Sequence, residues 1–451
     1  MAEWLSRDEA RRLCERVLSL TRAEGCQVSV SSGAHGNTRY AANEISTAGD
    51  TADATLTVSA RFGKRTASVT TNALDDAGLK RAQETSERLA RLAPENPELM
   101  PLLPAQRHQE VPAFFPTTAA FDAARRADAV AQATDAVQRA GFVAAGFFDR
   151  TAGASAVANS ASLFAYHAST LATHTLTVRT PEGDGSGWAG TGHNDAARLA
   201  NPAGLAERAI HKARGGRDPM SLEPGRYTVV LEPTAVGNLL GLLGSAFNAR
   251  TADEGRSFFA IRGGGTKLGQ RVADERVTIV SDAQDPDLLT RPYTAEGLPT
   301  ERLVWIDNGV LKNLAYDRFW ADSKGVKPTA AAGGLRLTGG TATLDELIAG
   351  VDRGLLVTRF WYIRSVDPRT LLYTGLTRDG VFQIEQGRVT RAVRNFRFNE
   401  SPMGMLDHLV ALGRPERVAG GEGGGGGFGA TLVVPPLVVR DFNFTSVSEA
   451  V

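Results

Sequence analysis

The sequence predicts an α+β protein with two N-terminal helix-plus-antiparallel-sheet units and a larger β-rich C-terminal domain. Three observations predict this. Amphipathic helical segments and alternating strand-like segments succeed one another in the first half of the chain. Two proline-containing stretches interrupt them, and short strand-and-turn segments dominate the second half. The 451 residues exceed one ordinary domain of roughly 100–200 residues, and 42% are hydrophobic, which is enough for several cores.

The first predicted unit covers residues 1–104. Ser6-Arg-Asp-Glu9 has the spacing of a capping box and predicts the start of a helix, while Gly25 marks its end. A second helix is predicted over Ala77–Leu92. The strand-like segments between them are Gln27–Ser31, Thr38–Ala42 and Ala54–Phe62. Four prolines close the unit: Pro94, Pro97, Pro101 and Pro104.

The second predicted unit covers residues 105–218 and repeats this pattern. Helices are expected over Ala119–Ala140 and Ala196–Ala213, and Pro219 marks the boundary. The strands between the helices are expected at Val143–Asp149, Ala154–Ser160, Leu163–His167 and Thr170–Arg179.

The C-terminal domain, residues 219–451, opens with a strand over Tyr227–Leu231 and a helix beginning near Pro233. Most of the remaining pattern is β. The stretch from Gly420 to Gly429 is nearly pure glycine and is predicted to be a mobile loop.

Charge and cysteine content exclude several classes of protein. Lysine and arginine (50) balance aspartate and glutamate (50), so no general attraction to nucleic acid or anionic lipid is expected. Only two cysteines occur, Cys14 and Cys26, which suits a reducing cytosol better than a disulfide framework. We see neither a signal peptide nor an apolar membrane span, and we expect a cytoplasmic protein.

The helix beginning at Pro233 is predicted to run on past Gly241 with two distinct faces. One is an apolar stripe: Val236, Leu239, Leu240, Leu243 and Phe247. The other carries small residues: Gly237, Gly241, Gly244, Ser245 and Asn248. Glycine inside a helix costs about 1 kcal/mol relative to alanine, so the small face needs a reason. Close packing of another backbone is the favoured explanation, and a cleft whose floor has no polar groups is the alternative.

Two other groups of residues are weighed as binding sites. In Arg359-Phe-Trp-Tyr-Ile-Arg364, strand alternation would place Arg359, Trp361 and Ile363 on one face. A core strand is the favoured interpretation, and a strand that grips a peptide is the alternative. His193-Asn-Asp195 resembles an acid/base pair, but its polar turn predicts a solvated position. His167 and His174 are seven apart in a predicted strand, which predicts opposite faces and argues against a metal site.

A series of short motifs extends from about residue 26 to about residue 447. They are Thr38-Arg-Tyr-Ala-Ala-Asn-Glu-Ile45, Val157-Ala-Asn-Ser160, Gly185-Ser-Gly-Trp188, Pro224-Gly-Arg-Tyr-Thr-Val-Val-Leu231, Glu296-Gly-Leu-Pro-Thr-Glu-Arg302, Asp307-Asn-Gly-Val-Leu-Lys312 and Leu344-Asp-Glu-Leu-Ile348. In this order and spacing the chain resembles the TldD/PmbA family, once called modulators of DNA gyrase. It resembles the PmbA (TldE) branch more closely.

The resemblance implies that this chain has lost a zinc site. In the TldD branch, the helix after the Val-Val-Leu strand carries His-Glu-x-x-x-His, and a cysteine near the C-terminus completes the site. The two histidines fall on Gly241 and Ala246, the glutamate falls on Leu242, and no cysteine follows Cys26. The TldD-branch Asp-Asp-Glu-Gly stretch reads Thr294-Ala-Glu-Gly297 here. The resemblance therefore implies neither a catalytic residue nor a metal in this chain.

The same resemblance implies a role beside an enzyme. A TldD-like zinc metallopeptidase subunit would supply zinc and base, and this chain would help to hold unfolded or modified peptides. Arg359, Trp361 and Tyr362 are the expected peptide-binding residues, and a homodimer is an open possibility. Two alternatives stay open: a stand-alone hydrolase with a different site, and an interaction protein that touches gyrase or DNA.

Overall fold

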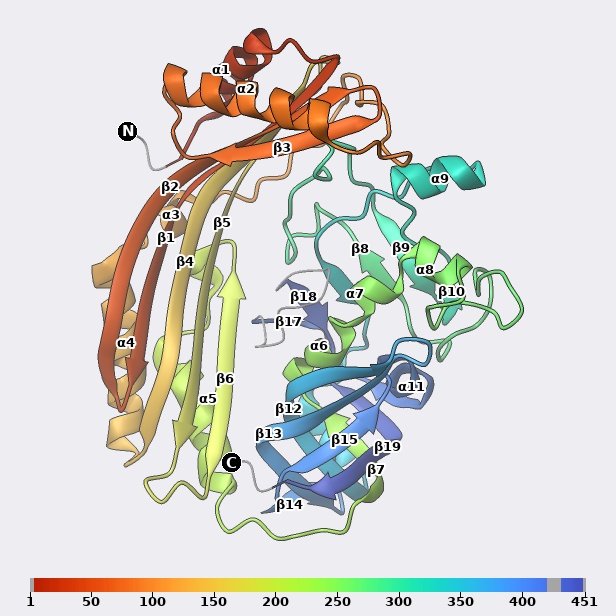
Figure 1. The fold of residues 1–451 in the computed structure, drawn as a ribbon. Helices are drawn as coiled ribbons and strands as arrows, with labels where there is room; N and C mark the ends of the chain where they lie inside the picture. The colour runs from red at the N-terminus through yellow and green to blue at the C-terminus, as the bar shows by residue number, and fades with distance from the viewer. Residues whose placement is uncertain (1–3, 420–430, 449–451) are drawn as a thin grey trace.

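The computed structural model describes residues 4–419 and 431–448 and has the predicted α+β architecture (Figure 1). A tall antiparallel sheet with helices on its outer side stands next to a β-rich C-terminal domain. The glycine stretch Gly420–Gly429, predicted to be a mobile loop, lies outside the described residues. None of the helices in the described part of the chain has the length and apolar character needed to span a membrane.

The tall sheet is built by both predicted N-terminal units together. Its order is β3-β2-β1-β4-β5-β6, and neighbouring strands are antiparallel. The strands are β1 (Gly25–Ala41), β2 (Glu44–Phe62), β3 (Arg65–Thr71), β4 (Val143–Asn159), β5 (Phe164–Arg179) and β6 (Ser186–His193). The β1–β4 pairing, from Gln27 opposite Asn159 to Tyr40 opposite Gly146, joins the units into one continuous sheet. The sequence pattern did not predict this joint.

Each pair of short strands predicted within β1, β4 and β5 is in fact one long strand. The predicted breaks fall where weak strand formers occur, such as Gly33 and Gly153. These two glycines lie opposite each other, and a Cβ atom on Gly33 would lie 2.8 Å from the Ala152 carbonyl oxygen. The glycines therefore permit close approach of the two backbones within a continuous ladder.

Helices cover one face of the sheet at both ends. They are α1 (Arg7–Leu20), α2 (Asp76–Leu92), α3 (Pro116–Ala119), α4 (Ala123–Arg139) and α5 (Pro202–Gly215), with a 3₁₀ turn at Ala196–Arg198. The predicted capping box at α1 is confirmed, because the Glu9 backbone N–H donates to Ser6 Oγ and the Ser6 N–H donates to Glu9. Alternate β1 residues, among them Val28, Val30 and Tyr40, are buried in the helix-covered cores.

The C-terminal domain holds two further sheets. The first has the order β10-β9-β8-β11-β18-β17. Its strands are β8 (Ile279–Ser281), β9 (Leu303–Asp307), β10 (Val310–Leu311), β11 (Leu335–Leu337), β17 (Glu416–Val418) and β18 (Leu432–Val434). The second contains β7 (Gly225–Leu231), β12 (Arg353–Asp367), β13 (Leu372–Glu385), β14 (Arg388–Ala392), β15 (Phe396–Glu400), β16 (Leu409–Leu412) and β19 (Leu437–Val447). Pairing of β12 with β13 closes β12-β7-β19-β15-β13 into a ring.

The helices of this domain are short. They are α6 (Pro233–Leu240), α7 (Leu243–Ala246), α8 (Ala249–Asp253), α9 (Arg318–Lys324), α10 (Leu344–Ala349) and α11 (Pro402–Asp407). Aromatic side chains fill the ring of strands: Phe360, Phe396, Phe398, Phe442 and Phe444. A single apolar core thus extends from this ring to α6 and α7.

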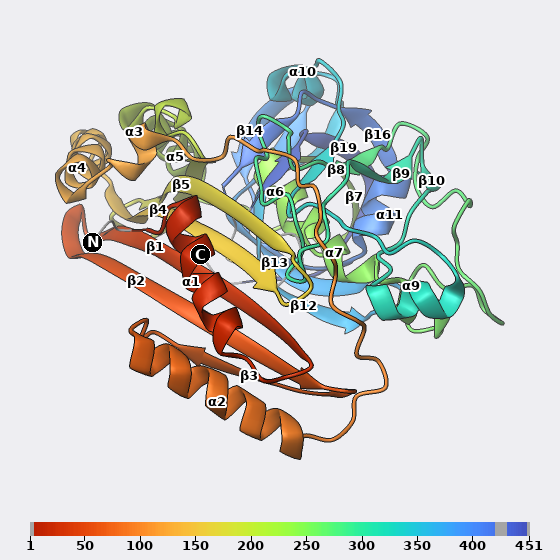
Figure 2. The same ribbon diagram turned by 90° about the horizontal axis from the view of Figure 1, so that it is seen from above.

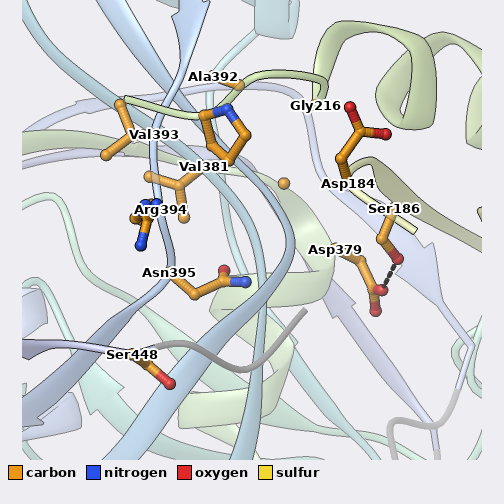
Figure 3. Close-up of a pocket in the computed structure, with 12 residues that line it drawn as sticks. Asp184, Ser186, Gly216, Asp379, Val381, Ala392, Val393, Arg394, Asn395 and Ser448 are labelled. Carbon is orange, nitrogen blue, oxygen red and sulfur yellow. Dashed lines mark hydrogen bonds between the residues drawn. The ribbon is translucent and has the colours of Figure 1, made fainter. Parts of the chain in front are cut away.

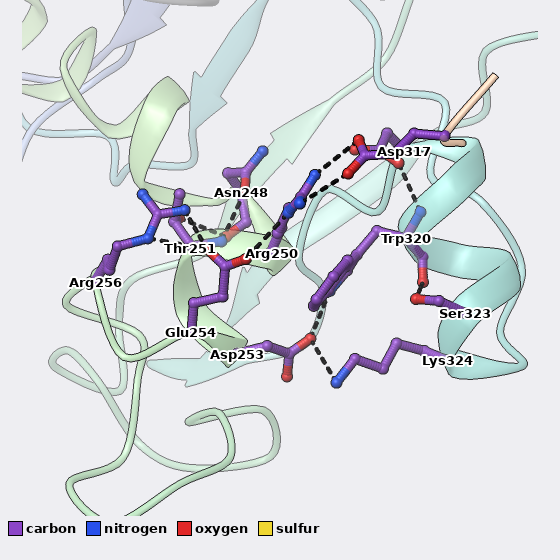
Figure 4. Close-up of polar contacts among 11 residues, drawn as sticks. Asn248, Arg250, Thr251, Asp253, Glu254, Arg256, Asp317, Trp320, Ser323 and Lys324 are labelled. Carbon is purple, nitrogen blue, oxygen red and sulfur yellow. Dashed lines mark hydrogen bonds and ion pairs between the residues drawn. The ribbon is translucent and has the colours of Figure 1, made fainter. Parts of the chain in front are cut away.

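The proline-containing segment between α2 and α3 is docked on the C-terminal domain (Figure 2). Glu98 in this segment accepts two hydrogen bonds from Arg250 of α8, each 2.9 Å long. The Trp320 indole of α9 donates to Asp253 of α8 at 2.7 Å, as Figure 4 shows. The contacts between α8 and α9 therefore provide a platform for the segment that connects the two halves of the sheet.

Candidate functional site

The segment that would carry zinc ligands is not one helix. α6 ends at Leu240, Gly241 and Leu242 form a turn, and α7 begins at Leu243. The prediction of a continuous helix was wrong, because Leu242 donates its N–H to the Leu239 carbonyl, and this tighter turn ends α6. The predicted apolar stripe is confirmed, since its members are fully buried: Val236, Leu239, Leu240, Leu243 and Phe247.

The small face of α6 packs against the sheet that contains β17 and β18. A Cβ atom on Gly237 would lie 3.0 Å from Val418 Cγ2, and one on Gly241 would lie 3.6 Å from Leu432 Cδ1. Side chains of neighbouring strands occupy the space next to both glycines. This supports the packing explanation for Gly237 and Gly241, although the partners are side chains and not another backbone.

The residues at the ligand-equivalent positions do not fit a zinc ion. Zinc is held in proteins by nitrogen, sulfur or carboxylate oxygen, and the side chains of Gly241, Leu242 and Ala246 contain none of these atoms. Within residues 4–419 and 431–448, no three His, Cys, Asp or Glu side chains gather closely enough to hold a metal ion. Cys14 and Cys26 are buried in the N-terminal core, where burial raises the pKa of Cys14 to about 12 and of Cys26 to about 11.

The most elaborate polar arrangement near α6 surrounds Arg359 of β12. Its guanidinium lies 3.1 Å from a carboxylate oxygen of Asp379 on β13, and both side chains are buried. Ser186 Oγ of β6 donates to the other Asp379 oxygen at 2.5 Å, as Figure 3 shows. The guanidinium also faces two indole rings, at 4.9 Å from Trp188 and 5.4 Å from Trp361. This cluster connects the tall sheet to the C-terminal ring of strands.

The contact between the tall sheet and the C-terminal ring of strands explains the motif Gly185-Ser-Gly-Trp188. Ser186 and Trp188 reach Asp379 and Arg359, while the two glycines allow α5 to pack directly on β6. A Cβ atom on Gly185 would lie 2.2 Å from the Ala213 carbonyl oxygen, and one on Gly187 would lie 2.1 Å from the Ala209 carbonyl oxygen. Real Cβ atoms do not approach backbone oxygen so closely.

We therefore expect Gly187→Ala to lower the free energy of unfolding by about 1–3 kcal/mol, because the backbones of α5 and β6 must separate. Urea unfolding followed by circular dichroism measures this change. Gly204→Ala is the matched control, because a Cβ atom there has no neighbour within 4 Å. Equal stability of the two variants would contradict the close approach.

The predicted alternation along Arg359–Arg364 was wrong beyond Trp361. The β12–β13 register is irregular between Trp361 and Arg364, and Tyr362 adopts φ +51°. As a result, Ile363 packs with Phe360 against the apolar core instead of lying with Arg359 and Trp361. Tyr362 is 57% exposed and contacts Arg364, whose guanidinium lies 4.2 Å from its ring. Arg359 and Trp361 do share a cleft of about 440 Å³, and Tyr362 does not line it.

A large cleft, of about 1180 Å³, lies between β6 and α5 on one side and the C-terminal domain on the other. At its base Lys212 and Glu232 form an ion pair of 2.6 Å, and Lys212 also donates to the Trp188 carbonyl at 3.2 Å. Glu232 immediately precedes α6, so this cleft opens beside the start of the helix. Sequence reasoning missed both residues, because they carry no recognisable motif.

Among the described residues, no histidine belongs to a cluster that could hold a metal ion, although His35 of β1 contacts the Asp149 carboxylate of β4. His167 and His174 lie on opposite faces of β5, as predicted: His167 lines a groove with Ser31, while His174 Nε2 lies 2.9 Å from Tyr40 Oη beneath α4 and α5. His193 is buried, so the prediction of a solvated turn was wrong. Its Nδ1 accepts the Asp195 backbone N–H at 2.9 Å, and burial lowers its pKa to about 4.

Comparison with protein-family models finds two adjacent matches. Residues 111–216 match the PmbA/TldA metallopeptidase central domain, and residues 224–446 match the PmbA/TldA metallopeptidase C-terminal domain. A metalloprotease of Methanothermobacter thermautotrophicus is 24% identical over 230 residues, 47% of this chain and 47% of that protein. An uncharacterized protein of Methanocaldococcus jannaschii is 35% identical over 106 residues, 23% of this chain and 24% of its own length. The chain thus aligns with about half, or less, of the curated relatives it matches.

Solved structures share the whole fold. TldE from Thermococcus kodakarensis superposes with a TM-score of 0.82 at 18% identity, covering 96% of this chain and 99% of that one. A proposed modulator of DNA gyrase from Thermotoga maritima gives a TM-score of 0.85 at 16% identity, with 96% and 100% covered. A similar protein from Bacteroides thetaiotaomicron gives 0.81 at 20% identity, with 97% and 98% covered. At these identities the likeness shows the fold alone.

Proposed function

The chain belongs to the PmbA/TldD metallopeptidase family, and from that premise we propose that it is a zinc-free, non-catalytic subunit of the TldE type. It would act beside a TldD-like zinc subunit in the cleavage of unfolded or modified peptides. The two unpaired, buried cysteines suit a reducing cytosol, where we place the complex.

One observation carries this proposal: the ligand-equivalent positions contain no metal-binding atom and lie in a packed segment. A Cβ atom on Gly241 would lie 3.6 Å from Leu432 Cδ1, and Ala246 is buried with its carbonyl accepting a hydrogen bond from Ser257 at 3.0 Å. The scaffold of the helix is retained by its apolar stripe, while zinc and a catalytic base would both have to come from the partner.

We propose different roles for the three expected peptide-binding residues. Trp361 lines the smaller cleft and is the best candidate for direct contact with a peptide. Arg359 lines the same cleft but is buried, with its guanidinium 5.4 Å from the Trp361 ring, while Tyr362 is exposed and does not line the cleft. We therefore assign peptide contact to Trp361 and a positioning role to Arg359.

The test is reconstitution with the TldD-like protein of the same cell. We expect the purified chain to contain far less than one zinc per molecule by mass spectrometry and to leave a fluorescence-quenched unfolded peptide intact. Mixing with the partner should produce hydrolysis that a chelator abolishes, because the partner alone supplies the metal.

Two controls make the result specific. A partner in which the glutamate of His-Glu-x-x-x-His is changed to glutamine should give an inactive mixture. Adding Leu242→Glu to this chain should not restore the activity of that mixture. One tightly held zinc per isolated chain would contradict the proposal. Chelator-resistant hydrolysis by the isolated chain would favour a stand-alone hydrolase instead.

A further inference from the structure

Three guanidinium groups, those of Arg198, Arg336 and Arg417, lie close to the carboxylates of Asp285 and Asp287. Arg336 donates to both oxygens of Asp285, at 2.5 and 2.6 Å, and to one oxygen of Asp287 at 2.9 Å. Arg198 occupies the other oxygen of Asp287, also at 2.9 Å. All four carboxylate oxygens are therefore engaged before the third guanidinium, that of Arg417, is considered.

Arg417 of β17 reaches only neutral acceptors. Its Nη1 donates to the Asn194 side-chain oxygen at 3.1 Å and to the Asp287 carbonyl oxygen at 2.6 Å. No carboxylate of the described residues lies within 4.0 Å of its guanidinium, and burial lowers its pKa to about 10. Asp287 and Asp285 still act on this cation electrostatically, but their carboxylate oxygens bond to other guanidinium groups, so an anion placed directly beside Arg417 would be stabilised.

This excess positive charge borders the large cleft. Arg198 and Arg417 both line it, together with Trp188 and Thr191 of β6. Four acidic side chains line the same cleft: Glu207, Asp345 and Glu416 are exposed, Glu232 pairs with Lys212, and none of them forms an ion pair with Arg417. The cleft thus brings together the Trp188 ring and the guanidinium of Arg417, which forms no ion pair with a carboxylate of the described residues.

A neighbouring donor also lacks an acceptor. The Asp195 N–H donates to Nδ1 of His193, so a neutral His193 carries its proton on Nε2. That Nε2 is buried and has no hydrogen-bond partner among the described residues. Arg417 and Arg198 both act electrostatically on His193, which places this donor in the same charged surroundings.

We propose that this edge of the cleft is a binding subsite for a peptide carboxylate, held by Arg417 with Arg198 beside it. A carboxylate matches the planar fork of a guanidinium and neutralises the single excess charge, whereas a phosphate dianion would exceed it. The inference rests on the proposed function, because it takes a peptide as the ligand and specifies the chemical group that the peptide must present.

The test measures binding to the isolated full chain, without any partner or zinc. The probes are short, fluorescein-labelled Ala/Ser peptides that differ only at the end: a free C-terminal carboxylate, a C-terminal amide, and an amide with one internal glutamate. Fluorescence anisotropy should show the free acid binding about tenfold more tightly than the amide, and Arg417→Gln should remove this difference. The peptide with the internal glutamate tells a terminal carboxylate from a side-chain carboxylate.

Two further variants separate binding from folding. Asp287→Asn removes a competing negative charge and should tighten binding of the free acid severalfold, a direction that damage to the fold would not produce. Arg16→Gln changes an exposed side chain of α1 and should leave the affinity for the free acid within about twofold of that of the original chain. Equal affinity of the original chain for acid and amide would overturn the subsite. That result would not affect the reconstitution experiment with a zinc subunit. The carboxylate subsite and the proposed subunit role can therefore be disproved independently of each other.

Discussion

Replacing Asp379 with alanine is expected to lower the free energy of unfolding by about 3–5 kcal/mol. The side chain of Arg359 is only 6% exposed, so the variant would keep a buried guanidinium without its counter-ion. Ser186 would also lose the acceptor that joins β6 to β13. Truncating one partner of a buried ion pair costs more than the pair itself contributes, because the other charge remains desolvated.

Guanidinium chloride unfolding, monitored by tryptophan fluorescence, measures this loss. The double variant Asp379→Ala with Arg359→Met should recover much of it, because no buried charge remains. Asp367→Ala is the matched control: this exposed carboxylate pairs with Arg369 on the surface, and its loss should cost less than about 1 kcal/mol. A similar loss in the Asp379 and Asp367 variants would contradict a buried, energetically coupled pair.

Trp305→Ala should have an effect of comparable size, about 3–5 kcal/mol, through a cavity in the C-terminal core. Trp305 is 1% exposed, and its ring stacks on Phe247 with a centroid separation of 4.6 Å. Its indole N–H also donates to Ser281 Oγ at 2.9 Å. Phe247 directly follows α7, so the cavity would open at the C-terminal end of this helix.

Urea unfolding measures the stability of the Trp305 variant, and near-ultraviolet circular dichroism reports the aromatic packing. Trp305→Phe should recover part of the loss, because a ring still packs against Phe247. Trp320→Ala, which removes a partly exposed indole that contacts Asp253, should cost clearly less. A Trp305 variant as stable as the Trp320 variant would show that this core can collapse around the gap.

Local signals predicted much of the fold. The capping box at Ser6, the strand predicted over Ala54–Phe62 and the helix predicted over Ala77–Leu92 depend on neighbouring residues only, and all appear in the structure. The breaks predicted inside β1 and β4 were wrong, because Gly33 and Gly153 lower strand propensity locally yet face each other across the sheet. Pairing between distant strands overrides local propensity, and no single segment reveals it.

The candidate site was likewise predictable from the sequence only in part. The three expected ligand-equivalent positions, Gly241, Leu242 and Ala246, come from the family resemblance, which aligns a known motif with this sequence; the turn that divides them between α6 and α7 was not predicted. Ser186 and Asp379 are 193 positions apart, and Asn194 and Arg417 are 223 apart, so nothing local predicts either contact. The exposure of Tyr362 escaped prediction because strict alternation assumes a regular strand, and β12 is irregular there.

The β1–β4 pairing has a practical consequence for dissecting this molecule. A version lacking residues 1–104 would lack β1, so the 17-residue strand β4 would become an edge strand. The backbone amide and carbonyl groups of β4 that bond to β1 would have no partner strand. Such edges promote aggregation, so truncation at the proline stretch should give insoluble material instead of a smaller working module.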